Sequence, residues 1–161
     1  MGFNTPLQVA EAMANAGKTK SCLPILQMIV LGIFAGAYIG FGAELATMVM
    51  TGTADKLGLG MAKFMGGAVF STGLILVVIC GAELFTGNNL MTIGLSQKQF
   101  GPVGLLYNWV FVYIANLIGS VLLVYIIMVA TFRSLLNPLI LLVGIPFAAV
   151  GAVLLLLVTG T

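Results

Sequence analysis

The chain has 161 residues, of which 61% are hydrophobic and 6% are charged, and its mean hydropathy is +1.21. An average soluble domain has about 25% charged residues, so this composition indicates a protein that lies within a lipid bilayer. The net charge of +2 is too small to attract nucleic acid, and two distant cysteines without any histidine indicate neither a disulfide framework nor a zinc site.

The first expected element is a short helix at the membrane surface, from Pro6 to Ala16. Thr5 is a suitable N-cap, Pro6 suits the first helical position, and Gln8 stands where a capping box requires glutamate or glutamine. The lysines follow this segment, whereas the basic residues of a secretory signal precede an apolar core. We therefore expect residues 1–22 to form an N-terminal surface helix.

Four segments are apolar enough to cross a bilayer, which requires about 20 predominantly apolar residues. We expect these spans at residues 23–50, 59–81, 103–129 and 138–158. Polar turns separate them at residues 51–58, 96–102 and 132–138. In the first span, Gly32, Gly36 and Gly40 recur every fourth residue, which predicts close packing of one helix face against a neighbouring helix.

The charged residues leave two questions open. Glu44 lies within the first span, where an ionisable residue usually faces a cavity and indicates a functional site. This span is longer than the hydrocarbon core requires, so a position of Glu44 near the lipid headgroups is the alternative. The two sides of the membrane have equal numbers of basic residues, so these residues do not set the orientation of the chain. One side has Lys18, Lys20 and Lys98, and the other has Lys56, Lys63 and Arg133.

The stretch "CGAELFTGNNL", from Cys80 to Leu90, interrupts the apolar sequence after the second span. The apolar piece that follows is too short to span a bilayer, so a helix, a break and a half-helix describe residues 59–95. Such a break is tolerated only where protein buries it or where it lines a watery cavity. A helix that restarts near Asn88 would aim N–H groups into the break, which suits an anion. We favour a permeation element over a simple loop.

The sequence "ICGAELFTGN" resembles the signature of the formate/nitrite transporter family, pentameric channels for small monovalent anions such as formate, nitrite and hydrosulfide. The stretches "NTPLQVAEAMANAGKTK", "GIFAGAYIGFG" and "NWVFVYIANLIGS" resemble other helices of that family. The resemblance covers about residues 1–129. It implies an all-α, polytopic membrane bundle of about four spans, with its second helix broken at membrane depth, that forms half of an aquaporin-like inverted-repeat channel fold.

The resemblance also implies roles for the residues of the break. Leu84 and Phe85 would form an apolar constriction, and Thr86 would place a hydroxyl in the pore. A carboxylate that faces the path would repel an anion, so we expect Glu83 to be structural. The residues expected to support the loop are Glu83, Gly87, Asn88 and Asn89.

In the family, as the resemblance implies, a central histidine lets the anion take up a proton transiently, which lowers the cost of entering an apolar passage. This chain has no histidine, and nothing in it matches the second three-span repeat of the family. Residues 130–161 instead resemble a membrane helix of the resistance-nodulation-division efflux transporters, with Pro146 inside the helix. We thus expect three parts, at residues 1–22, 23–129 and 130–161, with a junction near Ala130.

Two functions follow from these observations. The first is channel-like transport of small monovalent anions by a multi-pass homo-oligomer, a pentamer by resemblance, in the inner membrane of a bacterium. The alternative is an inserted membrane bundle without transport activity. No nucleophile–base pair or metal constellation indicates an enzyme, and no cofactor is expected.

Overall fold

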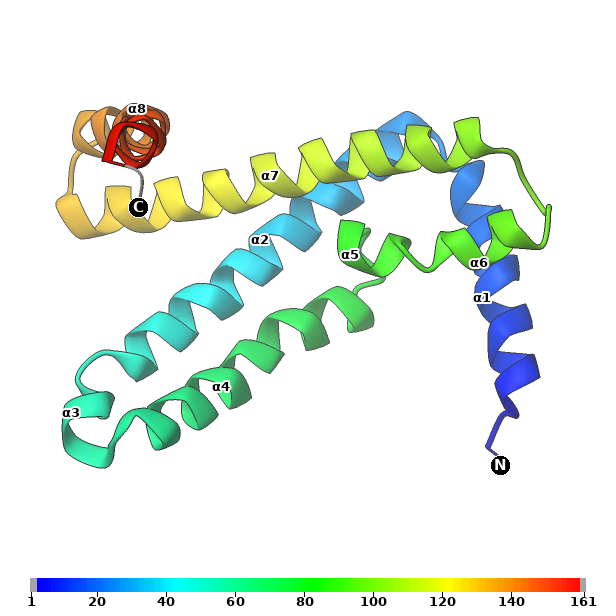
Figure 1. The fold of residues 1–161 in the computed structure, drawn as a ribbon, viewed down its shortest axis with the longest axis horizontal. Helices are drawn as coiled ribbons and strands as arrows, with labels where there is room; N and C mark the ends of the chain where they lie inside the picture. Colours follow the sequence, from blue (N-terminus) through cyan, green and yellow to red (C-terminus); the bar gives the residue numbers. More distant parts are fainter. Residues whose placement is uncertain (1–2, 160–161) are drawn as a thin grey trace. The chain divides into compact units, whose positions relative to one another are not determined.

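The structure is a computed structural model that describes residues 3–159, and these residues form helices and no strand. The all-α fold class expected from the sequence is therefore confirmed (Figure 1). The chain divides into two compact units, Met1–Val121 and Leu122–Thr161. The eight helices of the described part are α1 (Pro6–Ser21), α2 (Ile25–Met50), α3 (Thr53–Leu57), α4 (Leu59–Ile79), α5 (Phe85–Asn88), α6 (Met91–Ser96), α7 (Pro102–Phe132) and α8 (Leu136–Thr159).

Four of these helices, α2, α4, α7 and α8, are long and apolar enough to cross a membrane. Together with the apolar composition, they make this a multi-pass membrane protein. Each observed helix lies within a few residues of its expected span. The segment expected as a simple turn at residues 51–58 contains the short helix α3, which lies between two glycines of positive φ, Gly52 at 73° and Gly58 at 84°.

Helix α1 begins as its sequence predicts and ends later than expected. The Thr5 hydroxyl accepts a hydrogen bond from the Gln8 N–H, and the Gln8 side chain accepts one from the Thr5 N–H, which completes the capping box. The helix continues past Ala16 to Ser21, and Gly17 within it is buried against the Met91 backbone. Tertiary packing of α1 on α6 thus overrides the low helix propensity of glycine.

Helix α2 is central to the first unit, because both α4 and α7 pack closely against it. A Cβ added at Gly36 would lie 2.0 Å from the Asn116 carbonyl oxygen, and one at Gly119 would lie 2.0 Å from the Ile33 carbonyl oxygen. Contact with α4 occurs through Gly42 and Gly73, where an added Cβ would lie within 3 Å of a backbone oxygen. Backbones at this distance leave no room for side chains between them.

The three glycines expected to form one packing face do not all pack in the same way. Gly32 and Gly36 are buried against α7, and an added Cβ at Gly32 would lie 2.6 Å from the Ala115 Cβ. Gly40 is only half-buried, while Gly42 is fully buried at the crossing with α4. The i, i+4 spacing of Gly32 and Gly36 identified the face of α2 that packs against α7. Helix α4 packs against a different face of α2, at Gly42.

The second unit contains the end of α7 and the whole of α8. The turn between these helices is held by the Tyr125 hydroxyl, which donates a hydrogen bond of 3.0 Å to the Leu135 carbonyl. Pro146 lies inside α8, as expected from the sequence. A proline is tolerated inside a membrane helix where local adjustment and neighbouring groups satisfy the carbonyl that loses its partner.

We expect Gly119→Ala to destabilise the first unit because its methyl group would collide with the Ile33 carbonyl oxygen on α2. Overpacking of this kind costs about 1–3 kcal/mol. Thermal unfolding in detergent, followed by the fluorescence of the single tryptophan, Trp109, measures the effect.

The matched control is Gly67→Ala on α4, because a Cβ at Gly67 meets nothing within 4 Å. Alanine is favoured over glycine inside a helix by about 1 kcal/mol, so this variant should be at least as stable as the original chain. Equal loss of stability in the two variants would contradict the α2–α7 packing described above.

Candidate functional site

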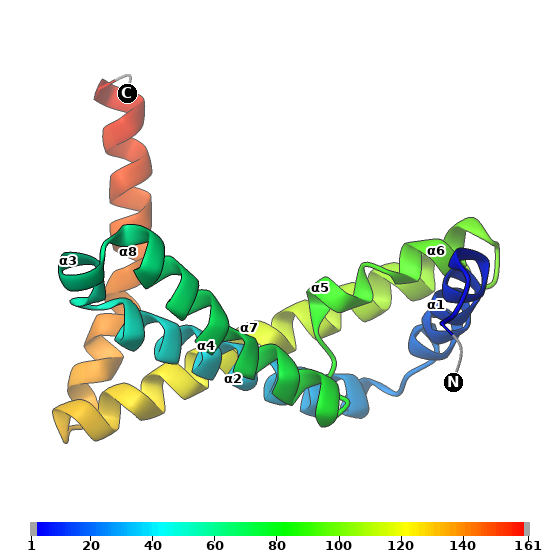
Figure 2. The same cartoon turned by 90° about the horizontal axis from the view of Figure 1, so that it is seen from below.

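The helix break expected at residues 80–90 is present in the first unit. Helix α4 ends at Ile79, Gly81 takes a positive φ of 61°, and the chain runs without helix to Leu84. Helix α5 then begins at Phe85, three residues before the expected restart near Asn88. The views of Figure 1 and Figure 2 show the short link from α4 to α5, which lies beside α7.

Two N–H groups at the break do not meet the expectation that free N–H groups point into it. The first N–H of α5, that of Phe85, donates a hydrogen bond of 2.9 Å to the Asn116 Oδ1 atom on α7. The Glu83 N–H donates to the Leu31 carbonyl at 3.3 Å. These donors are used to hold the chain, so neither of them is directed at an anion.

The three residues predicted to form the constriction lie in different surroundings. Leu84 is half-buried and extended, with φ −105° and ψ 125°. Phe85 is also half-buried, and its ring lies edge-on to Trp109 and Tyr113, at centroid distances of 5.8 Å and 5.3 Å. Thr86 is exposed, and its hydroxyl has no hydrogen-bond partner within residues 3–159. The pore roles of these residues stay predictions.

The four residues predicted to support the loop divide into two pairs. Glu83 and Asn88 are 6% and 1% exposed, and both belong to a polar network described below. Gly87 and Asn89 are exposed. The Asn89 carbonyl accepts a hydrogen bond of 2.8 Å from the Thr92 hydroxyl, which connects α5 to α6.

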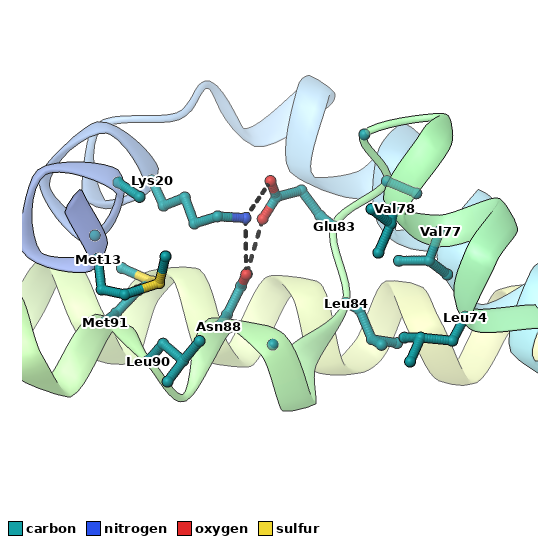
Figure 3. Close-up of a pocket in the computed structure, with 15 residues that line it drawn as sticks. Met13, Lys20, Leu74, Val77, Val78, Glu83, Leu84, Asn88, Leu90 and Met91 are labelled. Carbon is teal, nitrogen blue, oxygen red and sulfur yellow. Dashed lines mark hydrogen bonds and ion pairs between the residues drawn. The ribbon is translucent and has the colours of Figure 1, made fainter. Parts of the chain in front are cut away.

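Lys20, which sequence reasoning counted as a loop charge, reaches the centre of this network (Figure 3). Its Nζ atom lies 2.7 Å from Glu83 Oε1 and 2.9 Å from Asn88 Oδ1. Asn88 Nδ2 donates to Glu83 Oε2 at 2.8 Å and to Asn108 Oδ1 at 2.8 Å. Asn108 Nδ2 in turn donates to the Lys20 carbonyl at 3.1 Å, which closes the network.

The pair of Lys20 and Glu83 is the one salt bridge found in the described part of the chain. Their side chains are 31% and 8% exposed, so the carboxylate is almost completely removed from solvent. A buried carboxylate is tolerated when it is paired and hydrogen-bonded, and Glu83 has both kinds of partner. The pair cancels the negative charge that would otherwise repel an anion.

Helix α7 supplies three groups to the break that the sequence analysis did not assign. Asn108 and Asn116 bind it with their side-chain amides, and Trp109 Nε1 donates to the Asn88 carbonyl at 3.2 Å. The available signal was the presence of two asparagines within an apolar span. An amide in lipid requires a partner, but the sequence did not indicate which one.

Leu84 lines two of the cavities beside the break. The larger has a volume of about 500 Å³ and contains Lys20, Glu83 and Asn88 in its wall (Figure 3). The smaller, of about 240 Å³, is lined by Thr86, Tyr113, Asn116, Ser120 and otherwise apolar residues. Leu84 therefore borders both a cavity with a cationic group and a cavity that contains the Thr86 hydroxyl.

Other candidate groups are not part of this site. Glu44 is half-buried on α2 and has no salt bridge or hydrogen-bond partner for its carboxylate in the described residues. A search of the same residues found no group of three or more His, Cys, Asp or Glu side chains that could hold a metal ion. The polar groups of the site are thus those around the break.

Comparison with known proteins identifies the family of the chain. The family model described as "Formate/nitrite transporter" matches residues 7–152. The chain belongs to the formate/nitrite transporter family. This match continues beyond Ala130, where the sequence predicted a junction with a segment of another family.

Several curated relatives have names that describe formate transport. A probable formate transporter of Methanothermobacter thermautotrophicus is 44% identical over 132 residues, which are 80% of this chain and 48% of the relative. Formate channel BtFdhC of Bacillus thuringiensis is 36% identical, over 78% of this chain and 48% of its own length. Formate channel FocA of Escherichia coli K12 is 37% identical, over 74% and 41%. The chain spans about half the length of these family members.

We expect Lys20→Met to destabilise the protein because it leaves the Glu83 carboxylate buried without a counter-charge. Breaking a buried pair in this way costs about 3 kcal/mol. The double variant Lys20→Met/Glu83→Gln should recover part of the loss, because the uncompensated charge is then absent. Thermal unfolding in detergent measures the original chain, Lys20→Met, Glu83→Gln and the double variant.

Lys18→Met is the matched control, since Lys18 is an exposed lysine on the same helix. A surface substitution of this kind changes stability by about 0.5 kcal/mol or less. Additive losses in the double variant would show that the two side chains do not interact.

Proposed function

We propose that this chain forms one wall of a transmembrane path for small monovalent anions, with formate as the first substrate to test. The observation that carries the proposal is that Leu84 lines two cavities, one with Lys20 in its wall and one with the Thr86 hydroxyl, which has no partner in the described residues. The printed names of the relatives support formate as the substrate. Nitrite and hydrosulfide share its single charge and small size, so they are included in the proposal.

Each group at the break has a role in this function. The pairing of Lys20 with Glu83 removes the repulsion of the carboxylate, so that an anion meets a neutral wall at the larger cavity. Leu84 and Phe85 exclude water, so that an ion that enters loses its hydration. The Thr86 hydroxyl is free to donate a hydrogen bond to the anion and replaces part of that hydration.

An anion that takes up a proton avoids most of the cost of entering an apolar passage. Because the chain has no histidine, we propose that any such proton comes from hydronium in the solution on one side and is released to the solution on the other side. A weak acid such as formic acid then crosses the Leu84 side chain in its neutral form. The proposal therefore predicts faster transport when the pH is lowered towards the pKa of the substrate.

The setting of this path is also part of the proposal. We place the chain as a homo-oligomer, a pentamer by family resemblance, in the inner membrane of a bacterium. Residues 130–161 keep their resemblance to an efflux-transporter helix as a second proposal, in which α8 contributes a membrane anchor and no part of the path. Its single helix does not support a proposal of drug efflux.

The test is uptake of labelled formate by proteoliposomes that contain the chain, compared with empty vesicles of the same lipid. We expect uptake to exceed the empty-vesicle level and to rise as pH falls. If a correctly inserted and oligomeric chain gives no uptake of formate, nitrite or hydrosulfide, the alternative of a packed bundle without transport is the better description.

We expect Thr86→Val to reduce formate flux by about fivefold, because one hydrogen bond to the passing anion contributes about 1 kcal/mol. Stopped-flow measurements on proteoliposomes with equal protein content give the rates.

Thr72→Val on α4 is the control, because its hydroxyl donates to the Val69 carbonyl of the same helix and lies outside both cavities. Its flux should match that of the original chain. Unchanged flux in Thr86→Val would remove the hydroxyl from the path.

A further inference from the structure

We propose that Asn116 is a positioning residue that holds Leu84 in the anion path. This inference rests on the proposed function, and it adds a residue from α7, which the sequence did not single out. One side-chain amide bonds to both peptide groups that flank Leu84, and it fixes the backbone from which the Leu84 side chain projects.

Two hydrogen bonds of the Asn116 side chain hold the backbone on either side of Leu84. Asn116 Nδ2 donates to the Glu83 carbonyl at 2.8 Å, on the N-terminal side of Leu84. Asn116 Oδ1 accepts from the Phe85 N–H at 2.9 Å, on the C-terminal side. The extended conformation of Leu84 turns this carbonyl and this N–H towards the same side, where a planar carboxamide presents a donor and an acceptor.

The Asn116 amide pairs two backbone groups that the break leaves without helical partners. A residue in extended conformation between two helices has no partner strand for its neighbouring backbone groups, and such groups are costly in a membrane when unpaired. The Asn116 amide has the same donor and acceptor as a backbone peptide, so it takes the place of the missing strand. Aspartate lacks the donor and leucine lacks both groups, although each has nearly the same size as asparagine.

Asn116 is itself held in place from a third direction. Its Nδ2 atom also donates to the Gly32 carbonyl on α2 at 2.9 Å. This contact is possible because α7 lies against α2 at Gly36, where a side chain would collide with the Asn116 backbone. The amide is therefore fixed by the crossing of two helices and does not depend on the loop that it supports.

The hydrogen bonds of Asn116 indicate that this residue positions the loop and does not bind the anion. The residue lines the smaller cavity, but both amide atoms are engaged with backbone groups. In contrast, the Thr86 hydroxyl in the same cavity has no partner within the described residues. Asn116 consequently acts on the anion through Leu84 and does not contact it.

The test compares Asn116→Leu and Asn116→Asp with the original chain in lipid nanodiscs and proteoliposomes. Hydrogen–deuterium exchange measures the N–H groups of residues 82–88, independently of transport. In Asn116→Leu, loss of one hydrogen bond should make exchange of the Phe85 N–H about tenfold faster, with little change in α2 and α7. Formate and acetate uptake then give a permeability ratio, which should fall by about tenfold in both variants when Leu84 no longer excludes the larger anion.

Thr131→Val is the matched control on the same helix, because its hydroxyl bonds only to the Ile127 carbonyl of α7. It should keep both the exchange rate and the formate-to-acetate ratio. If Asn116→Leu fails to fold, Asn116→Asp supplies the test of the ratio, since it retains the size and the acceptor while it loses the donors.

The results distinguish this inference from the proposed function. Unchanged exchange at residues 82–88 in Asn116→Leu, or an unchanged ratio in a folded variant, overturns the positioning role. If the original chain transports no anion, the proposed function fails and the transport role of Asn116 fails with it. Hydrogen–deuterium exchange of residues 82–88 still shows whether the Asn116 amide holds the backbone around Leu84, because this measurement does not depend on uptake.

Discussion

The structure of the first unit depends on one constraint, the need to pair every backbone N–H and carbonyl that lies in lipid. A continuous helix meets this need by itself, but the segment between α4 and α5 does not. Its partners come from three other helices: the Leu31 carbonyl of α2, the Asn116 amide of α7 and, through the side chains of Glu83 and Asn88, Lys20 of α1. The break is stable only within this assembly.

Close helix packing is what brings these partners within reach. Glycines at the crossing of α2 and α7 allow the two backbones to approach until an added Cβ would lie 2.0 Å from a carbonyl oxygen. At this separation, the short side chain of Asn116 reaches both α2 and the break. The small residues therefore serve the polar site as well as the apolar packing, and the two cannot be separated in energetic terms.

The charges at the site have a similar double role. Glu83 and Asn88 hold α1 near the break through Lys20. The same contacts neutralise a buried carboxylate beside the cavity of about 500 Å³. The proposed anion path requires a positive or neutral wall, and the ion pair is consistent with this because it neutralises the carboxylate that anchors the loop.

Much of the fold could be predicted from local sequence. The capping box of α1, the four apolar spans and the break after α4 are local signals, because hydropathy, capping and helix interruption depend on residues close together in the chain. The family of the chain follows from the same stretches. The restart of the helix at Phe85 and the extension of α1 to Ser21 differed from expectation, since contacts with α7 and α6 decide them.

The partners of the break required the tertiary structure. Lys20 lies 63 residues from Glu83, and Asn116 lies 84 residues from Gly32. Sequence alone determined that this chain enters a membrane and breaks its second span, because the lipid rejects charges and unpaired backbone wherever they occur. Only the packing of α1, α2 and α7 decided which lysine meets the carboxylate and which amide holds Leu84, because a hydrogen bond depends on distances that helix crossings set.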